Sequence, residues 1–222
     1  MTFAKEAWPF TLPFAFLAAV LFLLNRPVWA IAALVVGLLV LLFFRDPART
    51  YGGEAGVVLA PADGLITRVD LIEDPEVGPG RYHRIVTFLS VFDIHVQRVP
   101  TAGEIIASRY ARGKKVAAFR EDAGEVNEKH LSVIRRPDGD LIGVRQIAGL
   151  LARRVVCYLK EGERVHRGQL MGLIKFGSRV DLTVPESYQV LVKKGDRVKN
   201  GQTPVATPPS GGSNGPPSGS AT

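Results

Sequence analysis

Hydrophobic residues at the start of the chain form two uninterrupted runs, over residues 7–24 and 28–44. Asn25, Arg26 and Pro27 separate the runs, and a proline at this point interrupts a helix. Apolar runs of this length are typical of helices that enter a membrane. The pattern therefore predicts two helices that fold back on one another as a hairpin.

The hairpin is short for a bilayer, because about 17 helical residues rise only about 25 Å against a hydrocarbon core of about 30 Å. These lengths permit either a tight spanning hairpin or a re-entrant one, and Pro9 and Pro13 favour the shallower form. A cleaved signal peptide is the alternative, with Lys5 as its charged end and residues 30–32 as its cleavage region. The second apolar run, which follows at once, argues against it.

Basic residues around the hairpin predict its orientation. Lys5 precedes it, Arg45 and Arg49 follow it, and Arg26 alone lies in its loop. The positive-inside rule then places both ends at the cytoplasmic side of the cell (inner) membrane, together with the domain that follows.

From residue 46 onward the hydrophobic pattern changes to short β-type runs bounded by glycine and proline, at residues 56–59, 65–69, 84–89 and 155–159. Long amphipathic helical periodicity is absent, so the pattern predicts a mainly β domain, sandwich-like or barrel-like. We expect the hairpin to occupy residues 1–45 and the β-rich domain residues 46–206. The Pro-, Gly- and Ser-rich tail at 207–222 is predicted to be disordered.

One internal repeat lies inside the β-rich domain. The sequence from Gly162 to Gln169 returns 33 residues later from Gly195 to Gln202, each copy reading as strand, glycine turn and strand. Two such hairpins can pair into a small sandwich, and the pattern resembles the half-motifs of biotinyl-lipoyl-type domains.

Charge and cysteine content narrow the functional classes. A net charge of +7 and a pI near 9.8 suit nucleic acid, an anionic membrane surface or an acidic substrate. The apolar N-terminus favours a membrane and no nucleic acid. Cys157 is the single cysteine, which excludes an intrachain disulfide and a cysteine-built metal site and fits a reducing cytoplasm.

Gly177-Ser178 lies between two β-type runs, where a Gly-Ser pair is ordinarily a turn. The same pair also suits a backbone N→O acyl shift, because glycine leaves its carbonyl open to attack by the serine hydroxyl. In a strained turn with a base nearby, the resulting ester can undergo β-elimination and leave a pyruvoyl group. The dipeptide alone does not decide between these interpretations.

Two further segments carry polar residues that could join this chemistry. In a strand, Asp93, His95 and Gln97 would project from one face, and a carboxylate beside an imidazole can orient it. A polar strand edge is the ordinary interpretation of that pattern. Asp63 lies in a predicted β-turn, where an aspartate is usually structural.

Taken in order after the hairpin, these segments resemble the phosphatidylserine decarboxylase family, most closely its short bacterial and archaeal form. The resemblance runs from residue 43 to residue 181. The matching pieces are Phe43-Phe44-Arg45-Asp46-Pro47, Pro61-Ala62-Asp63-Gly64, Asp93-Ile94-His95-Val96-Gln97-Arg98-Val99-Pro100, Asn127-Glu128, Gln146-Ile147-Ala148-Gly149, and residues 168–178.

The resemblance implies the roles of the candidate residues. Gly177-Ser178 is the processing site, and Ser178 becomes a covalent pyruvoyl cofactor, with neither metal nor pyridoxal phosphate. Asp63 would take part in self-cleavage, and His95, with Asp93 beside it, would act as acid or base in decarboxylation.

The resemblance also implies the reaction and the partners. The pyruvoyl group would form a Schiff base with phosphatidylserine in the bilayer, releasing CO2 and phosphatidylethanolamine. The partners are then an anionic membrane surface, the protein's own cleaved chains 1–177 and 178–222, and a homodimer by family analogy. Surface Lys and Arg would add attraction for anionic lipid.

One position departs from the family pattern. Long-form members carry a second histidine that activates the serine, and here that position is Arg98, a poor base. Either His95 does both jobs, or Asp63 acts through water, or one of the other histidines, His83, His130 and His166, folds in. We favour His95.

Three other functions compete with this one. A membrane-anchored biotinyl-lipoyl-like binding module would need Lys175 at a hairpin tip, whereas it lies inside a β-type run. A structural adaptor explains the hairpin but not Asp93, His95 and Ser178 together. A pyruvoyl decarboxylase of a small amino acid would not need the membrane hairpin.

Overall fold

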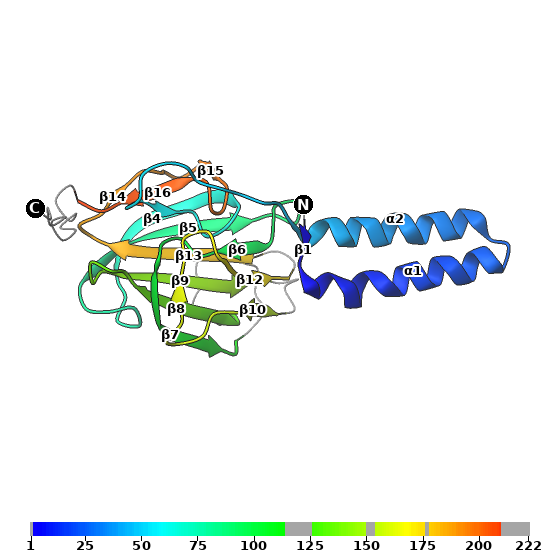
Figure 1. Ribbon diagram of the computed structural model, residues 1–222, viewed down its shortest axis with the longest axis horizontal. Coiled ribbons are helices and arrows are strands. Elements are labelled where there is room, and N and C mark those ends of the chain that lie inside the picture. Colours follow the sequence, from blue (N-terminus) through cyan, green and yellow to red (C-terminus); the bar gives the residue numbers. More distant parts are fainter. Residues whose placement is uncertain (1, 114–125, 150–153, 176–177, 210–222) are drawn as a thin grey trace, which may run out of the picture.

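The computed structural model describes residues 2–113, 126–149, 154–175 and 178–209. Two helices, α1 (Trp8–Leu23) and α2 (Pro27–Phe43), project as a hairpin from one end of a β-rich domain (Figure 1). A single 3-10 turn, η1 (Lys5–Ala7), precedes α1. Asn25 adopts a left-handed φ of 57° in the loop, and Pro27 begins α2. The predicted hairpin is confirmed.

The strands follow in chain order. They are β1 (Thr2–Phe3), β2 (Arg45–Asp46), β3 (Val58–Leu59), β4 (Gly64–Glu73), β5 (Arg81–Leu89), β6 (Val96–Arg98), β7 (Gly103–Ala111), β8 (Lys129–Arg135), β9 (Leu141–Ala148), β10 (Val155–Cys157), β11 (Arg164–Val165), β12 (Leu170–Ile174), β13 (Ser178–Pro185), β14 (Gln189–Val190), β15 (Arg197–Val198) and β16 (Pro204–Thr207). The mainly β fold predicted from the short apolar runs is confirmed.

One large sheet organises the domain. Its eight strands lie in the order β11-β7-β8-β9-β13-β5-β4-β15, and adjacent strands are antiparallel. Two three-stranded sheets, β10-β12-β6 and β14-β16-β3, accompany it, and β1 pairs with β2 to tie together the two ends of the hairpin. Strand β13 is therefore internal, between β5 and β9 (Figure 1).

The main core contains side chains from the large sheet and from both smaller sheets. Alternating residues of β13, Val180, Leu182 and Val184, face this core. Met171 from β12 and Val205 from β16 belong to the same cluster. The smaller sheets therefore cover one face of the large sheet, and this packing fixes which face each residue of β13 presents.

The two copies of the glycine-turn repeat have matching backbone contacts. The amide of Gly162 donates to the carbonyl of Ile105 at 2.7 Å, and the amide of Gly195 donates to that of Ile66 at 2.8 Å. The two copies do not pair strand to strand, although their second glycines, Gly168 and Gly201, lie close together. Strand β11 pairs with β7 and β15 pairs with β4, at opposite edges of the large sheet, because each copy satisfies the free hydrogen-bonding groups of an edge strand.

Candidate active site

Ser178 is the first residue of β13, opposite Leu89 of β5 and Ala148 of β9. The sequence pattern predicted Ser178 between two β runs, whereas the structure places it within a strand, and Gly177 lies outside the described residues. Strand alternation directs the Ser178 side chain to the same face as Val180, and the residue is fully buried. Within the described part of the chain its Oγ has no hydrogen-bond partner. A buried unpaired hydroxyl costs about 1–3 kcal/mol, which is unusual outside functional sites.

Asp93 and His95 do not lie in a strand, so the predicted strand face is wrong here. Strand β6 begins only at Val96, and the residues before it form a turn. The turn forms because the Asp93 carboxylate accepts hydrogen bonds from the backbone amide of Ser90 at 2.8 Å and from its hydroxyl at 2.7 Å. Arg197 donates to the other carboxylate oxygen at 3.1 Å. The carboxylate therefore caps the turn.

The backbone carbonyl of Asp93, and not its carboxylate, orients the imidazole. It lies 2.9 Å from Nδ1 of His95. Because a carbonyl only accepts, Nδ1 carries the proton and Nε2 keeps a lone pair. Nε2 is buried and has no partner among the residues that the structure describes. The ring of Phe43, from the end of α2, lies over the imidazole with 4.1 Å between centroids.

Burial lowers the pKa of His95 from 6.5 to about 4. The carbonyl and charge of Asp93, and more weakly the charge of Asp63, oppose this shift, while Arg45 adds to it. His95 is therefore neutral at physiological pH and can accept a proton on Nε2.

Backbone contacts hold His95 and Ser178 in the same corner of the domain. The carbonyl of His95 accepts a hydrogen bond from the amide of Ile174 at 3.2 Å, four residues before Ser178. From the other direction, Leu89 lies opposite Ser178 and only six residues before His95. The turn that carries His95 (residues 90–95, the histidine turn) and the start of β13 are therefore both connected to the segments of Leu89 and Ile174.

Asp63 is buried in an ion pair with Arg49, which contacts both carboxylate oxygens. The backbone amide of Asn200 also donates to Asp63, at 2.8 Å, and the Asn200 side chain donates to the carbonyl of Val96 at 2.7 Å. Asp63 is thereby connected to the residue that follows His95. Sequence analysis missed Arg49 and Asn200. The sequence signal that could have indicated Asn200 is a difference between the repeat copies, because the first copy has Arg167 at the equivalent position.

The glycine after Asp63 lets two strands approach closely. Gly64 has a φ of 151°, and a Cβ built there would lie 2.1 Å from the carbonyl oxygen of Phe88. Phe88 precedes Leu89, the strand partner of Ser178. The backbone beside the site therefore requires a glycine directly after Asp63.

Two buried glutamines support the histidine turn. Gln97 donates through Nε2 to the carbonyl of His95 at 2.7 Å, and Gln146 donates to Oε1 of Gln97 at 2.9 Å. Gln146 lies opposite Val180 in β13, so the network joins β6 to the strand neighbouring Ser178. Both residues fell within the sequence motifs, but no role was assigned to them.

Arg98, three residues after His95, is engaged in anchoring contacts. Its guanidinium pairs with Asp46 and donates to the carbonyl of Gly168 at 3.0 Å. It therefore connects β6 to the segment that leaves the hairpin.

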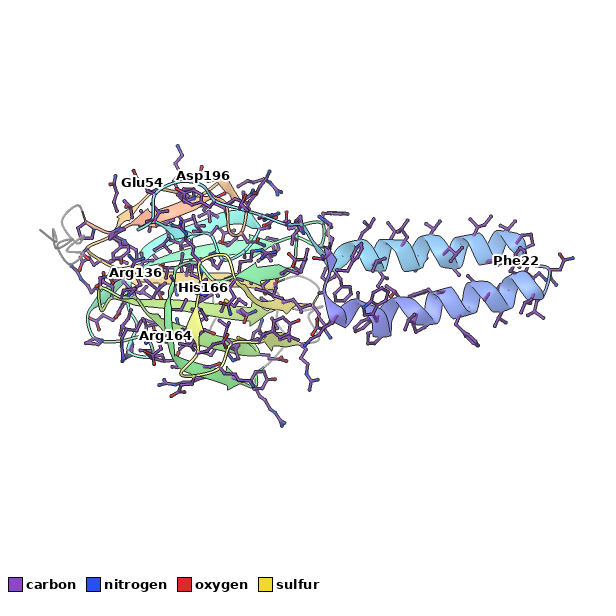
Figure 2. All side chains as sticks on the ribbon, viewed as in Figure 1. Phe22, Glu54, Arg136, Arg164, His166 and Asp196 are labelled. Carbon is purple, nitrogen blue, oxygen red and sulfur yellow. The ribbon has the colours of Figure 1, made fainter. Side chains whose placement is uncertain are left out.

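The three other histidines lie elsewhere. His83 is opposite Val184, six residues along β13 from Ser178, and its Nε2 contacts the carbonyl of Glu186 at 3.1 Å. His130 is 3.3 Å from the hydroxyl of Ser108. His166 lies between β11 and β12, away from the hairpin (Figure 2). Backbone contacts therefore connect the segment of His95 to the residues that flank Ser178, whereas the other three histidines contact other residues.

The structure also bears on a metal site and on Lys175, the lysine of the rival binding module. Across the described ranges, no three His, Cys, Asp or Glu side chains gather as a metal site. Lys175 follows the end of β12, and its Nζ lies 5.0 Å from the centroid of the Phe10 ring, against the hairpin base. A modification lysine would instead stand at an exposed hairpin tip.

The base of the hairpin packs onto the domain beside the site. Phe43, the last residue of α2, and Phe44, which follows it, form a cluster with Leu173 of β12 and Tyr158. Beyond this base, most large apolar side chains of both helices are exposed. Residues 5–23 are long and apolar enough to cross a membrane, with a hydropathy of 1.6, and α2 is a shorter apolar helix.

Known proteins show the same sequence features over most of the chain. The family model described as phosphatidylserine decarboxylase matches residues 36–206. A phosphatidylserine decarboxylase proenzyme of Symbiobacterium thermophilum is 42% identical over 93% of this chain and 95% of its own. Proteins of the same name from Saccharopolyspora erythraea (87% of this chain, 85% of theirs) and Gluconobacter oxydans (75% of each) are both 44% identical. The chain belongs to the phosphatidylserine decarboxylase family.

Proposed function

We propose that the chain is a proenzyme that cuts itself between Gly177 and Ser178. The product would convert phosphatidylserine to phosphatidylethanolamine and CO2 at a membrane surface. One observation supports this most directly. Ser178 Oγ and His95 Nε2 are both buried, both lack a partner among the described residues, and both belong to the same corner of the domain.

Self-cleavage would begin with neutral His95. Nε2 removes the proton from Ser178 Oγ, which attacks the Gly177 carbonyl carbon. The C–N bond breaks, and the nitrogen of residue 178 becomes a free amine in an ester. Loss of the Cα proton then breaks the bond between Cβ and Oγ. This step releases the Gly177 carboxylate and leaves residue 178 as a dehydroalanine. Water then hydrolyses the dehydroalanine, so that its nitrogen leaves as ammonia and a pyruvoyl group remains.

The residues around Ser178 fit the pyruvoyl group that results. Residue 178 would begin the small chain at the end of a strand that β5 and β9 hold on both sides. The group supplies a carbonyl that takes up the substrate amine and accepts the electron pair left when CO2 departs. His95, fixed through Nδ1, would deliver the proton that replaces CO2.

Asp63, Asp93 and Arg98 would act as positioning residues. Asp93 fixes the turn that carries His95, and Asp63 reaches the following residue through Asn200. Because Arg49 and Asn200 occupy the Asp63 carboxylate, a direct role for it as the base in self-cleavage would require this ion pair to open. His95 therefore remains the preferred activator.

The hairpin supports a position at the inner cell membrane, with the domain on the cytoplasmic side. Its apolar side chains are exposed, and the net charge of +7 favours an anionic leaflet. We assign residues 1–45 to attachment and residues 46–206 to catalysis. The tail at 207–222 lies almost wholly outside the described residues, and its disorder and a homodimer stay predictions.

Intact mass tests this proposal. We expect the wild-type chain to give fragments 1–177 and 178–222, the smaller one blocked by a pyruvoyl group in place of serine, whereas Ser178→Ala stays whole. His95→Gln should slow cleavage by about 100-fold or more. His83→Gln is the matched control and should cleave normally. A whole wild-type chain would indicate a membrane adaptor, and normal cleavage of His95→Gln would assign activation to Asp63 and water.

A further inference from the structure

A large apolar side chain stands exposed on the catalytic domain itself. Phe92 is 83% exposed and its neighbour Val91 is 44% exposed, in the turn that precedes His95. This turn is held in place, because Asp93 accepts the backbone and side-chain hydrogen bonds of Ser90. The exposure of Phe92 is therefore a property of a fixed turn, and an apolar side chain held out in this way is typical of a site that contacts a membrane or a partner.

The turn is fastened to the end of the hairpin. Arg45 follows α2 directly, and its guanidinium donates to the carbonyl of Leu42 at 2.9 Å and to that of Phe92 at 2.7 Å. One side chain thus holds the last turn of α2 and the tip of the histidine turn together. Phe92 consequently lies level with the place where the hairpin meets the domain.

Other aromatic residues and cations occur at the same level. Phe3 of β1 is 36% exposed, and Trp8, the first residue of α1, is 51% exposed. Lys5 lies over the ring of Tyr158 at 4.8 Å. Aromatic rings with neighbouring cations are typical of the layer between lipid tails and water. We call Phe3, Lys5, Trp8, Val91 and Phe92 the collar.

We propose that the collar lies in the headgroup layer of an anionic phospholipid bilayer, with Phe92 inserted below the phosphates. This inference rests on the membrane attachment under Proposed function and adds a second, catalytic-domain contact to it. Because His95 follows Phe92 by three residues, insertion would set the histidine end of the site at headgroup depth. The substrate headgroup could then be reached without lifting its tails from the bilayer.

Tryptophan fluorescence tests the depth of Phe92. In a Trp8→Phe, Trp29→Phe background, Phe92→Trp provides a single fluorophore on the collar. Leu191→Trp is the matched control, because Leu191 is 44% exposed and follows β14 at the end of the domain opposite the hairpin (Figure 1). Both variants are bound to phosphatidylglycerol–phosphatidylcholine vesicles that carry a quencher near the headgroup or deep in the acyl chain.

We expect the tryptophan at 92 to shift to shorter wavelength and to be quenched more by the shallow label than by the deep one. The tryptophan at 191 should be unaffected by either label. Equal emission from the two positions would overturn the inference. Intact mass on the same samples separates the two proposals, since normal cleavage with an unquenched residue 92 contradicts only the collar.

Activity provides a second measurement. Phe92→Asp should lower turnover on vesicles relative to turnover on a short-chain, monomeric phosphatidylserine by on the order of tenfold, since insertion of the ring is lost. Leu191→Asp should leave that ratio unchanged. An equal loss on both substrates in Phe92→Asp would show that the residue supports the fold of the turn, and would overturn its role in the bilayer.

Discussion

At the scale of single residues, the site is defined by how the polar atoms of His95 are paired. The carbonyl of Asp93 accepts a hydrogen bond from Nδ1, so the other ring nitrogen, Nε2, is left as a buried acceptor. Burial also lowers the pKa of His95 to about 4, which keeps the ring uncharged at neutral pH. These two effects together keep the imidazole in its neutral form, with the lone pair on Nε2.

The depressed pKa has a measurable effect on stability. Because the folded value is about 4 and the unfolded value about 6.5, the unfolded chain binds more protons between these two pH values. The stabilisation that comes from neutral His95 is fully present above about pH 6.5 and is lost as the pH falls towards 4. For this one group the slope is at most about 1.4 kcal/mol per pH unit.

Urea unfolding of the uncut Ser178→Ala chain in detergent checks this expectation. Its free energy of unfolding should fall from pH 6.5 to pH 4, and adding His95→Gln should make that fall shallower. Burial also lowers the pKa of His130, so His130→Gln is the comparison that measures the second histidine. The same slope with and without His95 would mean that its pKa is ordinary.

At the scale of elements, the hairpin contributes to the electrostatics of the site as well as to attachment. The ring of Phe43, the last residue of α2, covers the imidazole of His95. Arg98, three residues after His95 at the end of β6, pairs with Asp46 just beyond the hairpin. A change in how the hairpin sits on the domain would therefore reach His95 through both contacts.

Removing the Phe43 ring should let water reach the imidazole. We expect Phe43→Ala to raise the pKa of His95 from about 4 towards 6.5, because desolvation is the largest cause of its shift. NMR titration of the uncut Ser178→Ala chain in detergent measures this pKa directly. Phe22→Ala is the control, since Phe22 lies at the exposed tip of the hairpin (Figure 2). An unchanged His95 pKa would show that strands alone bury the ring.

At the scale of the whole molecule, the proposed cleavage site would divide the chain inside the large sheet. Strand β13 lies between β5 and β9, so the small chain would begin in the middle of that sheet. Farther along, β15 pairs with β4 and β16 pairs with β3. Asn200, which would belong to the small chain, also donates to Asp63, which would belong to the large one. The proposed cleavage would therefore break one peptide bond and leave these contacts in place.

We expect the two cleaved chains to remain one complex. They should elute together in detergent at 2 M NaCl, because backbone hydrogen bonds and apolar packing, which salt does not screen, connect them. They should separate only at the urea concentration that unfolds the domain, as followed by circular dichroism. Release of the small chain at lower urea would show that β13 is held less tightly than its position suggests.

Several features could be predicted from local sequence because their physical cause is local. Uninterrupted apolar runs and Pro27 determine the hairpin, and glycine-bounded β runs determine the strands. A β run directly after Gly177 followed from the same pattern, although the strand includes Ser178 itself. The strand predicted through Asp93 and His95 failed, because alternation cannot reveal that a carboxylate will cap a turn.

By itself, the sequence determined a membrane-type hairpin, a mainly β domain and, through its motifs, the family and the candidate residues. The tertiary structure alone decided which groups meet. Arg49 contacts Asp63, the Phe43 ring lies on His95, and the two repeat copies pair with opposite edges of the large sheet, so each contact joins residues that are separated along the chain. Such contacts, and the loss of solvent that sets the His95 pKa, depend on how sheets and hairpin pack, which no local pattern encodes.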